Sequence, residues 1–535
     1  MPLVSVSRAR TREPTAKNGL VTGIIDRNTL VLAVEGYPTR QSYRAGEEVV
    51  FCCSARVPSY SVEVARIGAD REVVWRRDGI AGTEHPTPPD AYAVGCDWPE
   101  AFRIPVPDEW RSGFYEVTLR GDGVDGPEAE SHAFFVVRSS HPGRDTGIVL
   151  VLATNTYNAY NKFGGKCLYT GATQVSFLRP IERGFLTRPD EPYDGRIASI
   201  EPAGDPGHHR LLDYLETHKY PMWCASTGWH NWERRFVRWA ERNGIALDFA
   251  VNSDLERHPD LLNGYRLMVS VGHDEYWSWG MRDAIDAFVE RGGNHAIFSG
   301  NTAFWQVRIE DDGHTMVCYK GQSSADPVAG TDRANVLTTF WSSPSIGRPE
   351  TSTIGLTFTR GGYSRIGRGT PHSSGAFTVY RPDHWAFAHT DLCYGDALGL
   401  GSYVVGYEVD GCAFTLDQGL PVPTHEDGAP EDLTILATAP ARLLSQTDTY
   451  SEIPKALWAD PDGPGDLEGV ATGLFGDASP ENKAKVAHGS AVIACFTRGA
   501  GTVFNAGSAD WSYGLDHDPL IQQVTRNVLT RLSAP

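Results

Sequence analysis

The sequence has no run approaching the roughly 18 consecutive apolar residues of a membrane-spanning helix, although 41% of its 535 residues are hydrophobic. Its first ten residues contain no apolar stretch followed by a small-residue cleavage site, which a secretory signal would have. We therefore expect a globular protein with no membrane partner, located in the cytoplasm. The nine cysteines form no C-x-x-C pair and show no disulfide spacing, so most should be buried, reduced thiols.

Basic residues are also few. The chain has 48 Lys and Arg against 67 Asp and Glu, which gives a formal net charge of -19. This balance argues against a nucleic-acid partner, because no face is expected to gather enough cations to bind phosphates. Neither G-x-G-x-x-G nor G-K-[ST] follows the first buried strand, and no Ser or Cys lies on a strand-to-helix turn with small neighbours. Nucleotide chemistry and a Ser or Cys hydrolase are therefore not expected.

What is present changes character near residue 140. Before it, alternating apolar and polar segments separated by Gly, Pro and Asp predict an Ig-like antiparallel β-sandwich over residues 1–140. The segments expected to be strands there include 48–54, 60–67, 113–120 and 133–138. Strand and helix patterns then alternate over 145–340, with helices expected over 229–243 and 279–290, which predicts an α/β domain with a mostly parallel sheet flanked by helices. We interpret residues 341–484 as a loop- and β-rich insertion. Residues 485–535 are expected to complete the α/β domain with strands at 490–496 and 501–505 and a final helix.

Three predicted strands of the α/β domain end in polar side chains. Residues 147–153 lead into Asn-Thr-Tyr-Asn-Ala-Tyr-Asn, residues 266–271 into Gly-His-Asp-Glu-Tyr-Trp, and residues 295–298 into Ser-Gly-Asn. In open α/β sheets, ligands bind beyond the carboxyl ends of the strands. The three polar ends therefore predict a functional site at one edge of the sheet. Trp277, Trp279, Phe304 and Trp305 are candidates for the walls of a small apolar pocket there, with packing in the core as the alternative use of each.

The second of these ends contains side chains suited to a metal. His273 and Glu275 are two residues apart, so both point to the same side while the backbone is extended. Carboxylate and phenolate oxygens suit a hard, highly charged ion, and phenolate ligation of iron is known in catalase. Alternatively, Glu275 caps the helix expected from about Trp279. The pair His208 and His209 lacks Cys or Glu at ligand spacing, and we interpret it as a solvated loop.

The segments around these strand ends resemble the large, catalytic subunit family of N,N-dimethylformamidase. The residues that match are Thr154–Tyr169, Val175–Pro180, Gly272–Ser278 and Arg291–Asn301. Members of that family hydrolyse a small tertiary amide to formate and dimethylamine, using one ferric ion in a domain shaped like the glutamine amidotransferases. The resemblance therefore implies an amidotransferase-like fold and an iron-dependent amidohydrolase acting on linear amides.

The family's iron is held by two tyrosinates and one glutamate. The resemblance places the glutamate on Glu275, with His273 as its neighbouring base and Asn301 lining the pocket. The first tyrosine falls on Tyr160, with Tyr157 as the competitor in the same run. The second tyrosine falls on Tyr169, with Tyr193 as the fallback.

Charge supports a single ferric ion, because two tyrosinates and one carboxylate carry three negative charges and leave positions open for water and substrate. Two other functions remain: a non-catalytic amidotransferase-like domain with a β-sandwich, serving as a carbohydrate- or protein-binding module, and a zinc metallohydrolase that uses His273 and Glu275. The resemblance also implies a small-molecule amide substrate. It further implies a homo-oligomer, with a small accessory subunit as a second partner.

Overall fold

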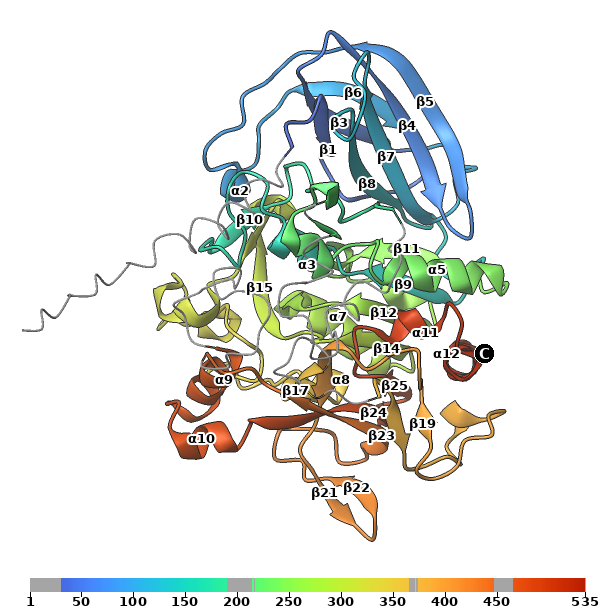
Figure 1. Ribbon diagram of the computed structural model, residues 1–535, viewed down its shortest axis with the longest axis vertical. Helices are drawn as coiled ribbons and strands as arrows, with labels where there is room; N and C mark the ends of the chain where they lie inside the picture. Colours follow the sequence, from blue (N-terminus) through green and yellow to red (C-terminus); the bar gives the residue numbers. More distant parts are fainter. Residues whose placement is uncertain are drawn as a thin grey trace, which may run out of the picture.

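A computed structural model describes residues 30–189, 214–215, 217–364, 371, 374–446 and 465–534. In Figure 1 the blue N-terminal strands form the upper part, the green strands and helices lie in the middle, and the orange and red strands β23 and β24 lie below. Within the described residues, no helix combines the length and the apolar character needed to cross a bilayer. Tyr193, His208 and His209 lie outside the described residues.

The N-terminal part consists of two sheets packed on each other. Four segments expected to be strands, 48–54, 60–67, 113–120 and 133–138, correspond to β3, β4, β7 and β8. The three-stranded sheet has the order β1 (Val34–Pro38), β3 (Glu48–Ala55) and β6 (Glu100–Pro105). The five-stranded sheet has the order β2 (Ser42–Tyr43), β8 (Glu130–Val137), β7 (Gly113–Gly121), β4 (Ser59–Ile67) and β5 (Arg71–Ala81). All neighbours are antiparallel except β2 and β8, and the Ig-like description stays a prediction.

The middle part is built on parallel strands. Their order is β11 (Asp248–Val251), β9 (Ile148–Leu152), β12 (Leu267–His273), β14 (Asn294–Gly300) and β25 (Gly501–Asn505). All neighbouring pairs in this row are parallel. Their carboxyl ends therefore lie at the same edge, as the sequence predicts, although the amidotransferase-like description itself stays a prediction.

The same sheet continues through antiparallel strands. Beyond β25 the order is β24 (His488–Arg498), β23 (Thr434–Arg442), β17 (Thr357–Ser364) and β20 (Tyr407–Gly411), with β18 (Phe377–Val379) and β19 (Ala397–Leu398) beside β23. Strands from the segment 341–484 thus extend the sheet on the far side of β25. The strands expected near 490–496 and 501–505 are present as β24 and β25.

Both faces of the parallel strands are covered, which explains why β9 is apolar throughout. Leu150 and Leu152 pack in one core with Phe236 of α5 (Glu233–Arg242). Val149 and Val151 pack in a second core with Ile285 of α7 (Trp279–Glu290). The helix predicted over 279–290 is confirmed, and the one expected from Trp229 begins four residues later, at Glu233.

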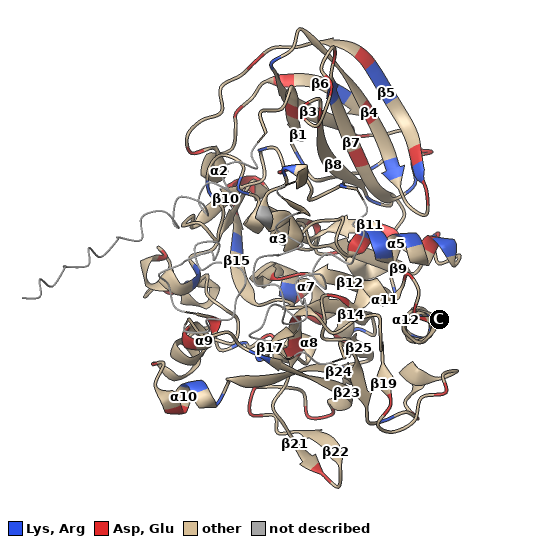
Figure 2. Ribbon diagram, in the orientation of Figure 1, with Lys and Arg blue, Asp and Glu red and all other residues tan. Residues whose placement is uncertain are grey.

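The remaining described elements form two small sheets and further helices. One further sheet has the order β10 (Gln174–Ser176), β16 (Thr315–Val317), β15 (Trp305–Glu310) and β13 (Tyr276–Ser278), and β21 (Phe414–Asp417) pairs with β22 (Leu420–Pro423). The other α-helices are α2 (Ala91–Val94), α3 (Thr154–Tyr160), α6 (Asn252–Arg257), α8 (Thr351–Ile354), α9 (Asp466–Phe475), α10 (Pro480–Ala484), α11 (Trp511–Gly514) and α12 (Pro519–Ser533). Among the described residues in the view of Figure 2, Lys and Arg are interspersed with Asp and Glu, as on β5 and α5.

The N-terminal sheets and the middle part share one core. Phe114 of β7 stacks on Trp229 with ring centroids 4.1 Å apart and an interplanar angle of 3°. Arg66 of β4 forms an ion pair of 2.6 Å with Glu241 of α5. Because the apolar cluster runs without a break from Phe114 to Leu150, the two parts are expected to be held as one unit.

Candidate metal centre and active site

The predicted strand ends meet at the carboxyl edge of the sheet. His273 is the last residue of β12 and pairs in register with Gly300 of β14, the residue before Asn301. The residue before His273 must be glycine, because Gly272 has a φ of +81° and a Cβ there would lie 2.7 Å from the Trp232 side chain. The backbone therefore delivers His273 and Asn301 to neighbouring positions.

Three oxygen-bearing side chains meet beside them. The Tyr169 hydroxyl lies 2.8 Å from both carboxylate oxygens of Glu275, and the Tyr160 hydroxyl lies 3.2 Å from Glu275 Oε2. Tyr160 ends α3, the helix that follows β9, and Tyr169 lies in the loop after it. Tyr160 and Glu275 are each only 2% exposed. The structure thus brings together the three residues that the family resemblance assigns to the metal.

Burial sets the protonation of these groups. It raises the pKa of Tyr160 and of Tyr169 well above the ordinary range, and the Glu275 carboxylate raises both further. Burial also acts to raise the pKa of Glu275, but the hydrogen bond and charge of His273, the charge of Lys320 and the Tyr169 hydrogen bond together outweigh burial and lower this pKa. Without a cation, both phenols therefore stay protonated and donate hydrogen bonds to a charged carboxylate.

His273 links this cluster to a second carboxylate. Its Nδ1 lies 2.8 Å from the Ser226 carbonyl oxygen, which accepts the Nδ1 hydrogen. Its Nε2 lies 3.3 Å from Glu275 Oε2 and 2.7 Å from Glu408 Oε2. Burial acts to lower the pKa of His273, but Glu408 and Glu275 outweigh it and raise the pKa to about 10. Asn301 donates a hydrogen bond of 3.3 Å to the same Glu408 oxygen.

Glu408 is a site residue that sequence reasoning missed. It lies in β20, within the segment interpreted as an insertion, and every residue of that strand is buried. An available signal was the run Tyr407-Glu-Val-Asp-Gly, in which two acids alternate with apolar residues inside a buried strand. Buried carboxylates are rare without a partner, so this pattern marks a structural or functional need.

Lys320 is a second missed residue. Its Nζ lies 3.2 Å from the centroid of the Tyr169 ring, and 5.3 and 5.2 Å from the centroids of the Tyr276 and Trp305 rings. This buried nitrogen has no hydrogen-bond partner among the described residues. Burial lowers the pKa of Lys320, while Glu275 acts to raise it. The lysine therefore presents its ammonium group to the face of the phenol ring rather than to a carboxylate.

The competitor Tyr157 lies elsewhere. Its ring packs edge-on against Phe134 of β8, with ring centroids 6.0 Å apart. Burial raises the pKa of Tyr157, and the nearby Glu233 carboxylate raises it further. The other competitor, Tyr193, lies outside the described residues. The helix cap considered for Glu275 is wrong, because Ser278 caps α7 by accepting a hydrogen bond from the Met281 amide.

Aromatic rings surround the cluster, but few of them were expected. Trp223 lies 5.7 Å from Tyr160 and 5.5 Å from Tyr169, between ring centroids, and Trp232 and Tyr407 lie 6.2 and 5.8 Å from the His273 ring. The aromatic side chains that the sequence offered as pocket walls mostly pack elsewhere: Trp277 on His295, Trp279 on Trp341, and Phe304 on Phe340.

The side chains present decide which metal the centre could hold. Within the described ranges, no three His, Cys, Asp or Glu side chains are arranged to hold a metal ion. A metal here would therefore depend on the phenol oxygens of Tyr160 and Tyr169 together with Glu275. Three hard oxygen donors that can carry three negative charges fit a trivalent cation.

Two comparisons of the sequence with known proteins name the same family. The sequence model described as "N,N-dimethylformamidase beta subunit-like, C-terminal" matches residues 61–525. The N,N-dimethylformamidase beta subunit of Paracoccus aminophilus is 25% identical over 478 residues, which cover 82% of this chain and 54% of that protein. The N,N-dimethylformamidase beta subunit of Alcaligenes sp is 24% identical over 475 residues, which again cover 82% of this chain and 54% of that protein. The chain thus spans about half the length of the curated relatives it matches.

Proposed function

The chain belongs to the N,N-dimethylformamidase beta subunit-like family, and we propose that it hydrolyses the C–N bond of a small amide such as N,N-dimethylformamide with the help of one ferric ion. The family predicted from the sequence is confirmed at this level. That this chain is the large, catalytic subunit is part of the proposal, because its relatives are named beta subunits.

One observation carries the proposal: the phenols of the buried Tyr160 and the half-buried Tyr169 converge on one carboxylate, at 3.2 and 2.8 Å. In the proposed centre, Tyr160, Tyr169 and Glu275 hold the iron. The bound ion would supply Lewis acidity, which polarises a carbonyl oxygen and makes water more acidic. A bound trivalent cation would also stabilise both phenols in their ionised form, because its charge would balance the three negative charges of the two phenolates and the carboxylate.

His273 and Glu408 are the proposed proton-transfer pair. Because Nδ1 of His273 is fixed by the Ser226 carbonyl, Nε2 is the atom free to exchange a proton with Glu408 Oε2, 2.7 Å away. Asn301 holds that Glu408 oxygen in place. The pair can accept the proton of an attacking water and return it to the leaving amine, a step typically worth about 10²–10⁴ in rate. Amines leave poorly without that proton.

The alternatives are less well supported by the side chains. A binding module without chemistry has no use for a buried His273 in contact with the two buried carboxylates of Glu275 and Glu408, since burying charges is costly. A zinc hydrolase needs further nitrogen, sulfur or carboxylate ligands, and the described residues offer no group of three. The naming of the relatives as subunits supports the expectation of an assembly, as a homo-oligomer or with a small accessory subunit.

The test combines metal analysis, visible absorption and hydrolysis of N,N-dimethylformamide. The purified protein should contain one equivalent of iron and show a tyrosinate-to-ferric absorption band. Tyr160→Phe, Tyr169→Phe and Glu275→Ala should each lose iron, the band and activity. Tyr157→Phe is the matched control on the same helix and should keep all three. One equivalent of zinc without iron, or full iron and activity in all three variants, would refute the proposal.

A further inference from the structure

Arg179 is a buried arginine that donates hydrogen bonds to the backbone on either side of the two tyrosines. It is 3% exposed, and its Nε donates a hydrogen bond of 2.8 Å to the Ser176 carbonyl. Its Nη1 donates to the Phe163 carbonyl at 2.6 Å, and its Nη2 donates to the carbonyl and the side-chain oxygen of Asn158 at 3.1 and 3.0 Å. One guanidinium therefore holds three backbone carbonyls.

These three carbonyls bracket the two tyrosines along the chain. Tyr160 lies between Asn158 and Phe163, and Tyr169 lies between Phe163 and Ser176. The guanidinium thus fixes the chain where it enters, turns and leaves the segment 158–176. None of its hydrogen bonds goes to Tyr160 or Tyr169, so it acts on the phenols only through the backbone.

Neighbouring bonds reinforce the same segment. Asn161 Nδ2 donates to the Pro180 carbonyl at 2.9 Å, and the Lys162 amide donates to Glu182 at 3.0 Å. Within the segment, the Leu168 amide donates to the Ala159 carbonyl at 3.0 Å. The chain that carries both phenols is therefore a closed loop tied to residues 176–182.

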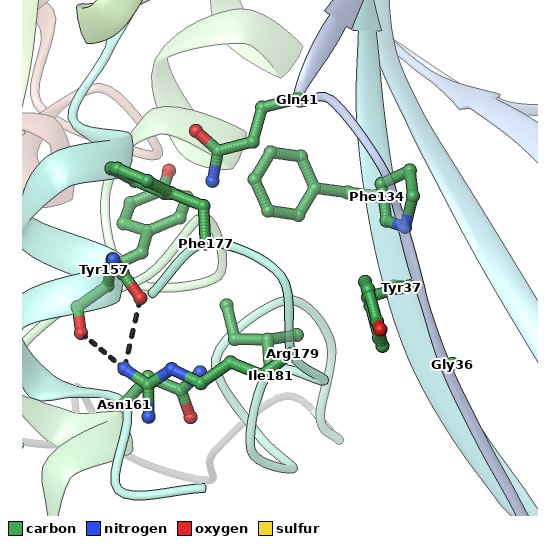
Figure 3. A pocket seen from close by; sticks show the side chains of 12 residues that line it. Gly36, Tyr37, Gln41, Phe134, Tyr157, Asn161, Phe177, Arg179 and Ile181 are labelled. Atoms are coloured by element: carbon green, nitrogen blue, oxygen red, sulfur yellow. Dashed lines mark hydrogen bonds between the residues drawn. The ribbon is translucent and has the colours of Figure 1, made fainter. Parts of the chain in front are cut away.

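Arg179 has no carboxylate within ion-pair distance among the residues that the structure describes. Figure 3 shows it with Asn161 at one end of a small cavity, with Gln41 and Phe134 of β8 at the other end. Burial lowers the pKa of Arg179 to about 10. A lysine could not replace it, because a single ammonium cannot reach acceptors with the planar, forked arrangement of donors that a guanidinium has.

We infer that Arg179 is a positioning residue that sets the spacing of the Tyr160 and Tyr169 hydroxyls, and so controls how tightly the site holds a trivalent cation. The inference rests on the proposed function. Ligands must be held to about 0.5 Å for a productive site. Loss of residues that orient metal ligands typically lowers metal affinity about 10–100-fold.

The test is Arg179→Lys, with Arg282→Lys as the matched control. Arg282 lies on α7, away from the 158–176 segment, and is also buried. Its guanidinium donates hydrogen bonds to the Thr353 hydroxyl and to the carbonyls of Arg348 and Pro349. Three readouts are compared: amide hydrogen exchange of the metal-free chains, ferric affinity, and the position of the tyrosinate-to-ferric band. For Arg179→Lys we expect faster exchange confined to 158–176, affinity reduced about 10–100-fold, and a shifted band. The control should change none of these.

Two results would overturn the inference: unchanged exchange over 158–176, or faster exchange with unaltered affinity and band, which would make Arg179 purely structural. If Arg179→Lys does not fold, Asn158→Ala removes one of the four bonds and is judged by the same readouts. Absence of iron from the unsubstituted protein would refute the proposed function, whereas the exchange data on the metal-free chain would still decide whether Arg179 orders the segment.

Discussion

Glu408 Oε2 lies 2.7 Å from Nε2 of His273. The two residues come from distant strands of the central sheet, because β12 is one of its parallel strands and β20 is the last antiparallel strand beyond β25. The contact joins the segment 341–484 directly to the proposed active site. An acid brought in from that segment therefore completes the proton-transfer pair, and the segment is more than an addition to the outside of the fold.

Glu408→Gln should lower kcat about 10²–10⁴-fold while iron and its absorption band are retained, because the amide cannot accept the proton. Steady-state kinetics and iron analysis of the same preparation check this. Glu350→Gln is the control, since Glu350 is a buried carboxyl bonded to Ser342 and Thr357 instead. A Glu408→Gln enzyme with unchanged kcat would remove Glu408 from the mechanism.

Lys320→Met should move the tyrosinate-to-ferric band to longer wavelength. An ammonium 3.2 Å from the Tyr169 ring centroid stabilises electrons on the phenolate, so its loss makes their transfer to iron easier. Lys320→Arg keeps the positive charge and should shift the band less. Visible absorption of the iron-loaded variants measures the effect, and identical spectra for the Lys320→Met variant and the unsubstituted protein would contradict it.

His295 should contribute to acid lability. Burial lowers its pKa to about 3, from about 6.5 in an unfolded chain. Because the unfolded state binds the proton more readily, the contribution of His295 to stability is complete above about pH 6.5 and declines as the pH falls toward 3. In urea titrations at several pH values, His295→Phe should lose less stability than the unsubstituted chain between about pH 6.5 and 4. Parallel profiles would show that His295 does not titrate as described.

Phe114→Ala should destabilise the whole chain by about 3–5 kcal/mol, because it removes the stack on Trp229 from a shared core. Denaturation followed by far-ultraviolet circular dichroism and by tryptophan fluorescence should give a single, coincident transition. Phe475→Ala, at a ring that is 37% exposed, should cost about 0.5 kcal/mol or less. Separate transitions for the N-terminal and central parts would mean that the core is not shared.

Sequence patterns predicted helices and strands well where neighbouring residues determine them, for example through a helix cap or a continuous apolar run. The helix over 279–290 has its cap at Ser278, and the apolar run at 148–152 forms a strand covered on both faces. The spacing of His273 and Glu275 placed these two side chains on one side of the strand end, and the family resemblance supplied Tyr160 and Tyr169. Glu408 and Lys320 could not be placed, because their positions depend on strand order and loop packing far along the chain. Tyr157 and Tyr160 were separated only by the packing of α3 against β8.

The place of β25 in the sheet has a consequence for biosynthesis. Residues 501–505 lie between β14 and β24, so the strand that joins the two parts of the sheet is synthesised after all the other described strands of that sheet. Until then, β14 and β24 each present an open edge to other nascent chains, which is where aggregation begins. Production of this protein should therefore depend on chaperone holding until translation has passed residue 505.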